Sequence, residues 1–230
     1  MTIATRSRVT TYAQAAAEGR VVVGHLVRLA CERHLRDLET GASRGLAFDE
    51  ASADRAITLF SYLRQSKGQW AGQPLALQDW QAFVVGSIFG WKETATGLRR
   101  FRKAYTEIAR KNGKTTLASG IALYLLDFDG AAGAEVYCAA TKRDQAKICW
   151  TEAMQMVKRT PALKRRIKIT ESRANLHVIE TNSKFEALGA DNDSMDGLNP
   201  HAYIIDELHA HKTRGIVDAL ETAAGARQQP

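Results

Sequence analysis

The sequence predicts an α/β fold in which a mostly parallel central sheet is flanked by helices and preceded by a helical region. Two observations carry this prediction. After Gly97, short apolar runs alternate with longer amphipathic patterns, which is the order of strands and helices in parallel βαβ units. Before that point the apolar residues recur at helical spacing. We therefore expect a helical region over 1–95 and an α/β core over 96–230.

The composition is that of a folded protein with an excess of basic residues. Of the 230 residues, 45% are hydrophobic and 25% are charged, and the net charge is +7. This excess fits an anionic partner such as nucleic acid, or simply a soluble basic surface. The three cysteines form no CxxC pair, which argues against a disulfide framework or a zinc cluster and fits a reducing compartment. The sequence shows no signal peptide, and its longest apolar run, near 121–126, is too short to span a bilayer, so we expect a cytosolic protein.

In the N-terminal region we expect three helices after a loose arm. Residues 1–20 are polar, rich in alanine and without a clear pattern. Helical spacing of apolar residues predicts a first helix over 21–38. Asp49 is a suitable N-cap for a second helix that reaches Leu63. A connector rich in turn residues follows, and a third helix ends near Phe89.

In the core, the apolar runs predict strands at 101–109, 134–140 and 202–206, with helices at 113–127 and 142–158. "RIKIT" and "NLHVIE" are separated by a short turn at 171–174 and predict an antiparallel hairpin. "KFEALG", immediately after them, predicts another short strand.

In the stretch "IARKNGKTTLASG", residues 108–120, the turn ends in Gly-Lys-Thr, as the turn of a phosphate-binding loop does. In such a loop a strand leads into a tight turn, and the backbone N–H groups of the turn and of the following helix attract phosphate. Lys114 is placed to reach the β- and γ-phosphates, and the Thr115 hydroxyl is placed to bind Mg²⁺. The glycine that usually opens the loop is absent, because Ile108 stands in its place.

The tripeptide GKT is weak evidence alone, and "AYIIDELHAH" supplies the second half of the site. Asp206 follows an apolar strand pattern, and ligands in parallel sheets bind at the carboxyl ends of strands. We expect Asp206 to hold Mg²⁺ and Glu207 to polarise the attacking water. The plainer interpretation of two consecutive acids is a helix N-terminus. The order of loop and acids along the chain favours the nucleotide site.

Several further residues have both a functional and a structural interpretation. Arg110 and Lys111 precede the loop glycine and could contact the γ-phosphate, or form a solvated basic turn. His201, His209 and His211 lie near Asp206, but their spacing fits no zinc motif, so solvated or hydrogen-bonded histidines are the better interpretation. No nucleophile-elbow motif indicates an acyl-transfer enzyme.

Taken together, these pieces resemble the large terminase subunit of tailed bacteriophages. The resemblance runs from about Gly68 to Pro230 and rests on several ordered motifs. These motifs are "GQPLALQDWQAF", "EIARKNGKTTLASGIALYLL", "VYCAATKRDQAKICWTEA", "FEALGADNDSMDGLNPHAYIIDELHAHK" and "ALETAAGARQQP". The family tolerates a Walker A loop that lacks its first glycine. The resemblance implies a P-loop NTPase of the additional-strand type, with ATP and Mg²⁺ as cofactors.

The resemblance also implies roles for individual residues. Gln81, beside Trp80, would contact adenine. The loop residues would bind the phosphates, namely Arg110, Lys111, Asn112, Gly113, Lys114, Thr115 and Thr116. Thr115 and Asp206 would hold the metal, while Glu207, Arg110 and Lys114 would be catalytic. Some members carry an arginine shortly before Walker B that acts on a neighbouring subunit, but "SMDGLNP" has none there. Arg143 and Arg173 are alternatives for that role.

The implied function is ATP hydrolysis that powers the translocation of double-stranded DNA into a prohead. The implied partners are the DNA, the portal, a small terminase subunit and further copies in a homo-oligomeric ring, in the host cytoplasm and transiently on the prohead. The sequence stops at Pro230, before the family's coupling strand and nuclease domain, so we expect no nuclease activity in this chain. Two alternatives stay open: a helicase-like P-loop ATPase, and a basic DNA-binding module that has lost hydrolysis.

Overall fold

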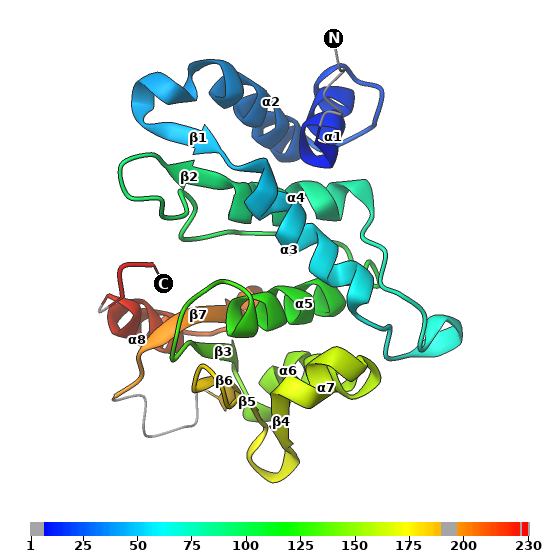
Figure 1. Ribbon diagram of the computed structural model, residues 1–230, viewed down its shortest axis with the longest axis vertical. Helices are drawn as coiled ribbons and strands as arrows, with labels where there is room; N and C mark the ends of the chain where they lie inside the picture. Colours follow the sequence, from blue (N-terminus) through cyan, green and yellow to red (C-terminus); the bar gives the residue numbers. More distant parts are fainter. Residues whose placement is uncertain (1–6, 190–196, 226, 230) are drawn as a thin grey trace. The chain divides into compact units, whose positions relative to one another are not determined.

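A computed structural model of the chain describes residues 7–189, 197–225 and 227–229 (Figure 1). The chain divides into two compact units. The first unit contains residues 1–61 and 76–106, and the second contains 62–75 and 107–230. The backbone therefore passes three times from one unit to the other.

In its described residues, the first unit contains four helices, a 3-10 turn and a short antiparallel ribbon. The helices are α1 (Arg8–Ala17), α2 (His25–Thr40), α3 (Glu50–Tyr62) and α4 (Asp79–Gly90). The turn η1 (Gly41–Arg44) leads into strand β1 (Leu46–Phe48), which pairs with β2 (Trp91–Glu93). The three helices predicted in this region are confirmed, as is Asp49 as an N-cap, since its Oδ1 accepts a hydrogen bond from the Ser52 backbone N–H at 3.1 Å.

Helix α1 corrects our expectation of a loose arm over residues 1–20, of which residues 1–6 lie outside the described part. The side chain of Ser7 caps the helix by accepting from the Thr10 N–H. Val9, Tyr12 and Ala13 are buried in the core of the first unit. Alanine has the highest helix propensity and leaves room for close packing, so the alanine-rich composition favours a docked helix.

A series of buried hydrogen bonds connects side chains in the core of the first unit. The indole Nε1 of Trp91 donates to His34 Nδ1 at 3.0 Å, and His34 Nε2 lies 3.1 Å from Thr10 Oγ1. Burial lowers the pKa of His34 to about 4, so the ring is neutral at physiological pH. Nearby, the guanidinium groups of Arg44 and Arg100 pair with the fully buried carboxylate of Asp37.

The second unit is built on a five-stranded sheet with the order β4-β5-β6-β3-β7. The strands are β3 (Glu135–Ala140), β4 (Ile167–Thr170), β5 (Asn175–Val178), β6 (Ser183–Gly189) and β7 (Pro200–Ile205). Strand β3 pairs in parallel with β6 and β7, whereas β4, β5 and β6 pair antiparallel. The sheet is therefore mixed and not mostly parallel. The predicted hairpin is confirmed as β4–β5 and extends the main sheet, because antiparallel neighbours need only short connections.

The predicted strand at 101–109 is wrong. These residues form neither strand nor helix, and most of them are exposed, with Tyr105 at 76%. A strand inside a parallel sheet is buried on both faces and needs a continuous apolar run. Arg102, Lys103 and Glu107 interrupt that run. The predicted strand at 202–206 is confirmed as β7, which is half-buried over Ala202–Ile205, as an edge strand of the described sheet would be.

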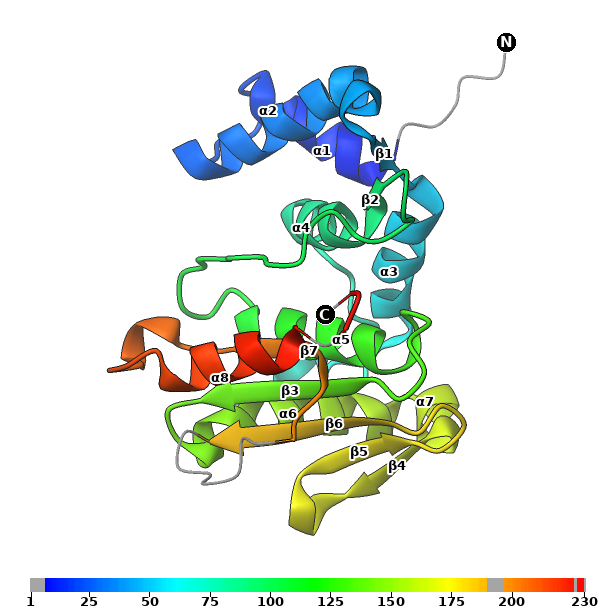
Figure 2. The same cartoon turned by 90° about the vertical axis from the view of Figure 1, so that its left-hand side faces the viewer.

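Helices cover both faces of this sheet (Figure 2). Helices α5 (Lys114–Asp127) and α6 (Arg143–Arg159) pack on one face, and α8 (Gly215–Ala224) packs on the other. The short helix α7 (Pro161–Arg166) joins α6 to β4, and the 3-10 turns are η2 (Gly68–Trp70), η3 (Glu171–Arg173) and η4 (Leu208–Ala210). No helix in the described part of the chain is long and apolar enough to cross a membrane.

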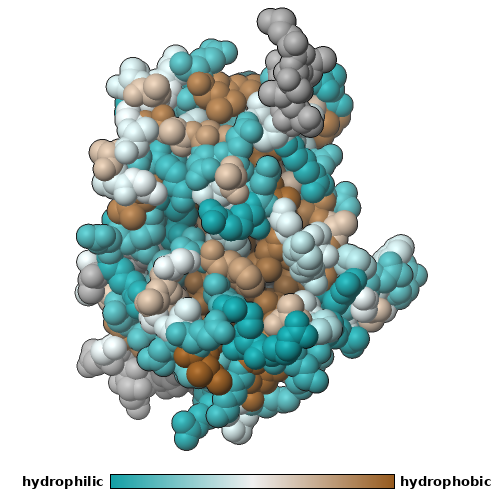
Figure 3. Space-filling view, in the orientation of Figure 1, coloured by the Kyte–Doolittle hydropathy of each residue, from teal (hydrophilic) through white to brown (hydrophobic). Residues whose placement is uncertain are grey.

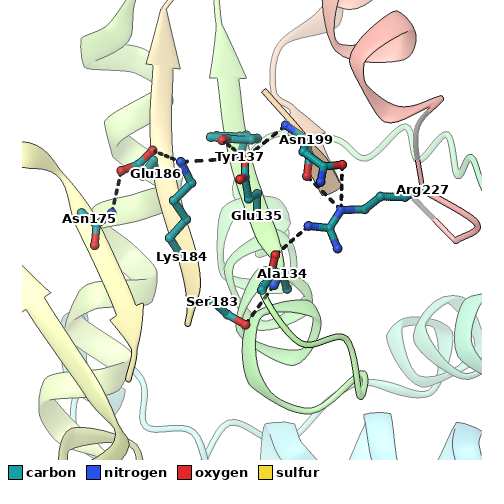
Figure 4. Close-up of polar contacts among 10 residues, drawn as sticks. Ala134, Glu135, Tyr137, Asn175, Ser183, Lys184, Glu186, Asn199 and Arg227 are labelled. Carbon is teal, nitrogen blue, oxygen red and sulfur yellow. Dashed lines mark hydrogen bonds and ion pairs between the residues drawn. The ribbon is translucent and has the colours of Figure 1, made fainter. Parts of the chain in front are cut away.

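Beside α8, the second face of the sheet carries a polar network around an open hollow of about 680 Å³ (Figure 4). Asn175 Nδ2 donates to Glu186 Oε1 at 2.6 Å, and Lys184 Nζ lies 3.4 Å from Glu186 Oε2. The Arg227 guanidinium donates to the backbone carbonyl of Gly133 at 2.6 Å. These contacts link the strands on the part of this face that lies beside α8, and a polar face is typical of the solvated side of an antiparallel sheet.

Candidate nucleotide-binding site

The loop before α5 has the backbone of an anion-binding turn. Gly113 is the N-cap of α5 and has φ 75°, a left-handed conformation that glycine adopts without strain. Lys111 also has a positive φ, 65°, which is uncommon for a residue with a side chain. The N–H groups of Lys114, Thr115 and Thr116 lie in the first helical turn and have no intrahelical acceptor. The loop therefore presents unpaired donors at the positive end of a helix.

Lys114 lies between the two acidic residues that follow β7. Its Nζ is 3.1 Å from Asp206 Oδ1 and 2.5 Å from Glu207 Oε1. The Asp206 N–H donates to the carbonyl of Ala139 at 3.2 Å, which holds the end of β7 against the end of β3. Because β3 and β7 are parallel, both end at the edge where α5 begins. The folded chain thus joins the GKT loop to the distant acids.

The Lys114 ammonium sets the charge state of this cluster. Its hydrogen bond and its charge hold the pKa of Glu207 below the usual range, with smaller contributions from His209 and Arg110. The hydrogen bond to Glu207 is also the main cause that raises the pKa of Lys114. Lys114 and Glu207 are therefore both ionised at neutral pH.

Glu207 is held in an unusual backbone conformation. It has φ 50°, in the left-handed region, and its N–H donates to Asp206 Oδ1 at 2.9 Å. Non-glycine residues with positive φ are uncommon and occur often at functional sites. The conformation aims two consecutive acids at the same lysine, which an extended strand would place on opposite faces.

A buried serine anchors the helix that carries the loop. Ser119 Oγ lies 2.8 Å from the Thr115 carbonyl and 2.9 Å from the Cys149 carbonyl of α6. We did not single out Ser119 in the sequence. A serine inside an otherwise apolar helix pattern is the signal that could have found it, since a buried hydroxyl needs partners.

The remaining loop residues are exposed. Asn112 Nδ2 donates to the carbonyls of Ala109 and Arg110, at 3.2 and 3.3 Å, and so closes the turn. Arg110 and Lys111 are exposed, and the charge of Arg110 reaches Glu207. Both cations therefore lie on the same loop as the lysine that contacts the acids.

Other predicted residues have different surroundings. Gln81 belongs to the first unit, where its Oε1 accepts from the Gln78 N–H at 2.8 Å, and Trp80 packs against the core of that unit. Arg143 donates to the carbonyl of Arg173 at 3.3 Å. The first three residues of "SMDGLNP" lie outside the described part of the chain.

Two of the three histidines near Asp206 have a carboxylate partner, whereas the buried Nε2 of His211 has no hydrogen-bond partner among the described residues. His201 Nε2 is 2.8 Å from Asp129 Oδ2, and His209 Nδ1 is 3.4 Å from Glu207 Oε2. Among the described residues, no three His, Cys, Asp or Glu side chains gather as a metal cluster. The contact with Asp129 agrees with our interpretation of His201 as a hydrogen-bonded side chain.

The donor set fits a magnesium ion that also binds phosphate. Mg²⁺ prefers hard oxygen ligands and is usually held by one or two protein oxygens, with phosphate and water completing the shell. Asp206 offers such an oxygen, because its contacts use Oδ1 and, among the described residues, Oδ2 has no partner. Thr115 offers a hydroxyl at the helix start.

Comparison with known proteins identifies the family. Residues 79–230 match the model of the terminase large subunit, ATPase domain. The chain belongs to this family. It is 32% identical over 169 residues to the large terminase subunit of Enterobacteria phage HK97, a match that covers 71% of the chain and 32% of the relative. The crystal structure of the HK97 bacteriophage large terminase superposes with a TM-score of 0.67 at 29% identity, over 77% of the chain and 36% of that structure.

Membership of the terminase ATPase family confirms the resemblance seen in the sequence. It also accounts for the mixed α/β architecture, which the HK97 structure shares. The chain spans about a third of the length of its HK97 relative. The family match begins at Asp79, so it includes Gln81, the loop and both acids.

Proposed function

We propose that this terminase domain hydrolyses ATP at the Lys114–Asp206–Glu207 cluster, and that hydrolysis powers the translocation of double-stranded viral DNA into a prohead. The observation that carries the proposal is the position of Lys114, 3.1 Å from Asp206 and 2.5 Å from Glu207 at the start of a helix. A lysine in this place can exchange its carboxylate partners for the phosphates of a nucleotide. The family supports ATP as the nucleotide.

Different residues of the site bind the nucleotide and take part in the reaction. The N–H groups of the first turn of α5 and the Lys114 ammonium bind the phosphates. When Lys114 turns to the phosphates, Glu207 loses its partner and can accept a proton from the water that attacks the γ-phosphorus. Thr115 and Asp206 would hold Mg²⁺, which would neutralise phosphate charge when bound. Arg110 would stabilise the charge that develops on the transferred group.

The partners follow from the same family membership. We propose that the working motor is a homo-oligomeric ring that contacts duplex DNA, a portal and a small terminase subunit, in the host cytoplasm and transiently on the prohead. Gln81 would contact the adenine and Thr116 would add to the phosphate site. The basic excess of the chain supports contact with a DNA backbone.

The replacement Glu207→Gln tests the assignment. It keeps the size and some hydrogen bonding of the side chain but removes the base, so we expect phosphate release to fall by about 10³-fold while binding of a fluorescent ATP analogue persists. Glu18→Gln is the matched control, because Glu18 is an exposed acid of the first unit. Phosphate release that survives in Glu207→Gln would refute the assignment. A wild-type chain that binds the analogue without turnover, even at concentrations that favour assembly, would favour a non-hydrolysing module.

A further inference from the structure

Almost all of the net positive charge of the chain comes from eleven consecutive residues. The segment 158–168, "KRTPALKRRIK", contains six of the 32 lysines and arginines and none of the 25 acids. The rest of the chain therefore has 26 cations against 25 acids and is almost neutral. We call the six side chains the basic surface: Lys158, Arg159, Lys164, Arg165, Arg166 and Lys168. All six residues are exposed.

The fold presents these cations on a fixed backbone. The segment covers the last turn of α6, all of α7 and the start of β4. Val157, just before the segment, and Leu163 and Ile167 within it are buried and attach the segment to the core of the second unit. Thr160 Oγ1 donates to the carbonyl of Tyr62 at 3.4 Å. A charged loop would be free to move, whereas these side chains project from anchored elements.

In the described part of the chain, most of the basic surface has no counter-charge. Lys158 pairs with Glu171, and Arg166 pairs with Asp127 and Glu180. Among the described residues, the other four cations contact no carboxylate: Arg159, Lys164, Arg165 and Lys168. Four unpaired cations on one short segment repel each other, so an external anion would relieve a repulsion that the fold leaves in place.

The basic surface does not belong to the nucleotide site. Arg166 pairs with Asp127, the last residue of α5, whereas Lys114 is the first. At 1.5 Å per residue, these two ends of α5 are about 20 Å apart. The strand register gives the same result. Ile167 pairs with Val178, which pairs with Ser183 at the beginning of β6, whereas the nucleotide site lies where the parallel strands β3 and β7 end. The cations therefore need a partner other than the phosphates of ATP.

The chemistry of the segment favours a phosphate backbone as that partner. Its only exposed apolar residues are Pro161 and Ala162, and it contains no aromatic residue. Insertion into a membrane needs larger apolar side chains, and a protein interface usually has an apolar or aromatic centre. Figure 3 shows a mostly hydrophilic surface over α7. Arginine and lysine without apolar neighbours are typical of contacts to nucleic-acid phosphates, which carry no sequence information.

We infer that the basic surface over 158–168 binds the phosphate backbone of duplex DNA, at a site about 20 Å from the nucleotide. The inference rests on the proposed function for the choice of duplex DNA. The surface would hold DNA through the charges of Arg159, Lys164 and Arg165, independently of base sequence. Lys168 adds less, because its side chain lines the hollow on the other face of the sheet. Arg166 mainly anchors the segment to α5.

The test is a triple replacement, Arg159→Ala, Lys164→Ala and Arg165→Ala, compared with Arg20→Ala, Arg36→Ala and Lys67→Ala. Both sets remove three exposed cations, so the net charge of the two variants is the same. Binding of a labelled duplex is measured by fluorescence anisotropy over a salt series without nucleotide. Loss of three phosphate contacts should lower the slope of log K against log salt by about 2 to 3 and reduce affinity by about 10²-fold. Thermal melting checks that both variants fold.

The outcomes separate the alternatives. Equal losses in the two variants would mean a diffuse charge effect and would overturn the inference, as would wild-type binding in the first variant. Competition by polyglutamate as effective as by duplex would indicate an acidic protein partner instead. Tyr62 is exposed next to Thr160, so a preference for single strands that Tyr62→Ala abolishes would indicate base stacking and also overturn it.

The inference and the proposed function can fail separately. Binding of the ATP analogue and phosphate release are measured on the same variants. Unchanged DNA binding in the first variant, with turnover that depends on Glu207, would refute only the basic surface. Reduced DNA binding, in a chain whose turnover survives Glu207→Gln, would refute only the catalytic assignment.

Discussion

The two ends of α5 carry charge in opposite ways. At its first residue, Lys114 contacts Asp206 and Glu207, so the cation is neutralised within the protein. At its last residue, Asp127 is fully buried and pairs with Arg166, beyond which lie cations with no partner. We call the first group the balanced cluster, and this end of α5 the balanced end, because its lysine is paired with carboxylates of the protein. The other end carries a net positive charge that faces solvent.

This difference indicates two kinds of anion binding. A phosphate that enters at Lys114 must displace carboxylates, so binding there depends on geometry and on the proton states of the acids. A phosphate that reaches the basic surface displaces only counterions, so binding there depends on salt. The same chemical group can thus be bound selectively at one end of the helix and without selectivity at the other.

The largest expected effect concerns the arginine that acts in hydrolysis. Arg110 lies on the loop, and its charge contributes to the low pKa of Glu207, whereas Arg143 is bonded to the Arg173 carbonyl. We expect Arg110→Ala to lower phosphate release by about 10³-fold and Arg143→Ala to leave it nearly unchanged. Both are measured at saturating ATP over a range of chain concentrations.

The opposite result would also be informative. If Arg143→Ala abolishes a turnover that rises with chain concentration, and Arg110→Ala does not, the acting arginine comes from a neighbouring subunit. The balanced cluster would then be incomplete in one chain.

A smaller effect should separate the anchoring cation from the free cations of the basic surface. Arg166 Nε and Nη2 lie 2.8 and 2.9 Å from the two oxygens of Asp127, whose side chain is fully buried. Arg166→Ala would leave that buried carboxylate without its partner, so we expect the free energy of unfolding to fall by about 2 kcal/mol. The fall is smaller than for a fully buried ion pair, because Arg166 itself is partly exposed. Arg165→Ala should change it by less than about 0.5 kcal/mol.

Urea unfolding, followed by far-UV circular dichroism, compares the two variants. Equal destabilisation would contradict the division into anchor and free cations. A stable Arg166→Ala with reduced DNA affinity would place Arg166 among the DNA contacts.

Much of this arrangement could be predicted from the sequence where the signal is local. Helical spacing predicted α2, α3, α4, α5 and α6, and the "RIKIT" and "NLHVIE" runs predicted β4 and β5. The approach of Lys114 to Asp206 followed from a general rule, that parallel strands present their carboxyl ends at one edge. Each of these inferences needs only a repeat of apolar residues or a known chain order.

The rest depends on tertiary contacts that a pattern does not contain. The run at 101–109 is apolar enough to suggest a strand, but its charged residues leave it outside the sheet. Residues 8–17 do have apolar residues at helical spacing, since Val9, Tyr12, Ala13 and Ala16 are buried on one face of α1. Four of its six apolar residues are alanines, which can face either the core or solvent, so we did not recognise the pattern. The cluster "KRTPALKRRIK" is visible in the sequence, yet which cations are free is decided by the distant Asp127 and Glu171.

The smallest expected effect tests the backbone of the balanced end. Gly113 has φ 75°, where a side chain costs about 1 kcal/mol, so Gly113→Ala should lower the free energy of unfolding by about that amount. Relief of this strain would tilt the N–H groups that face the phosphates, and we expect ATP-analogue affinity to fall as well. Gly19→Ala is the matched control, since Gly19 has φ 76° and open space around its Cβ position in the first unit.

Gly19→Ala should therefore cost similar stability without any loss of nucleotide binding. Gly113→Asn should recover part of both losses, because asparagine tolerates the left-handed region better than alanine. Nucleotide affinity that is unchanged in Gly113→Ala would mean that the turn does not contribute its N–H groups. The balanced end would then bind phosphate through Lys114 alone, by charge, and its contrast with the basic surface would be much smaller.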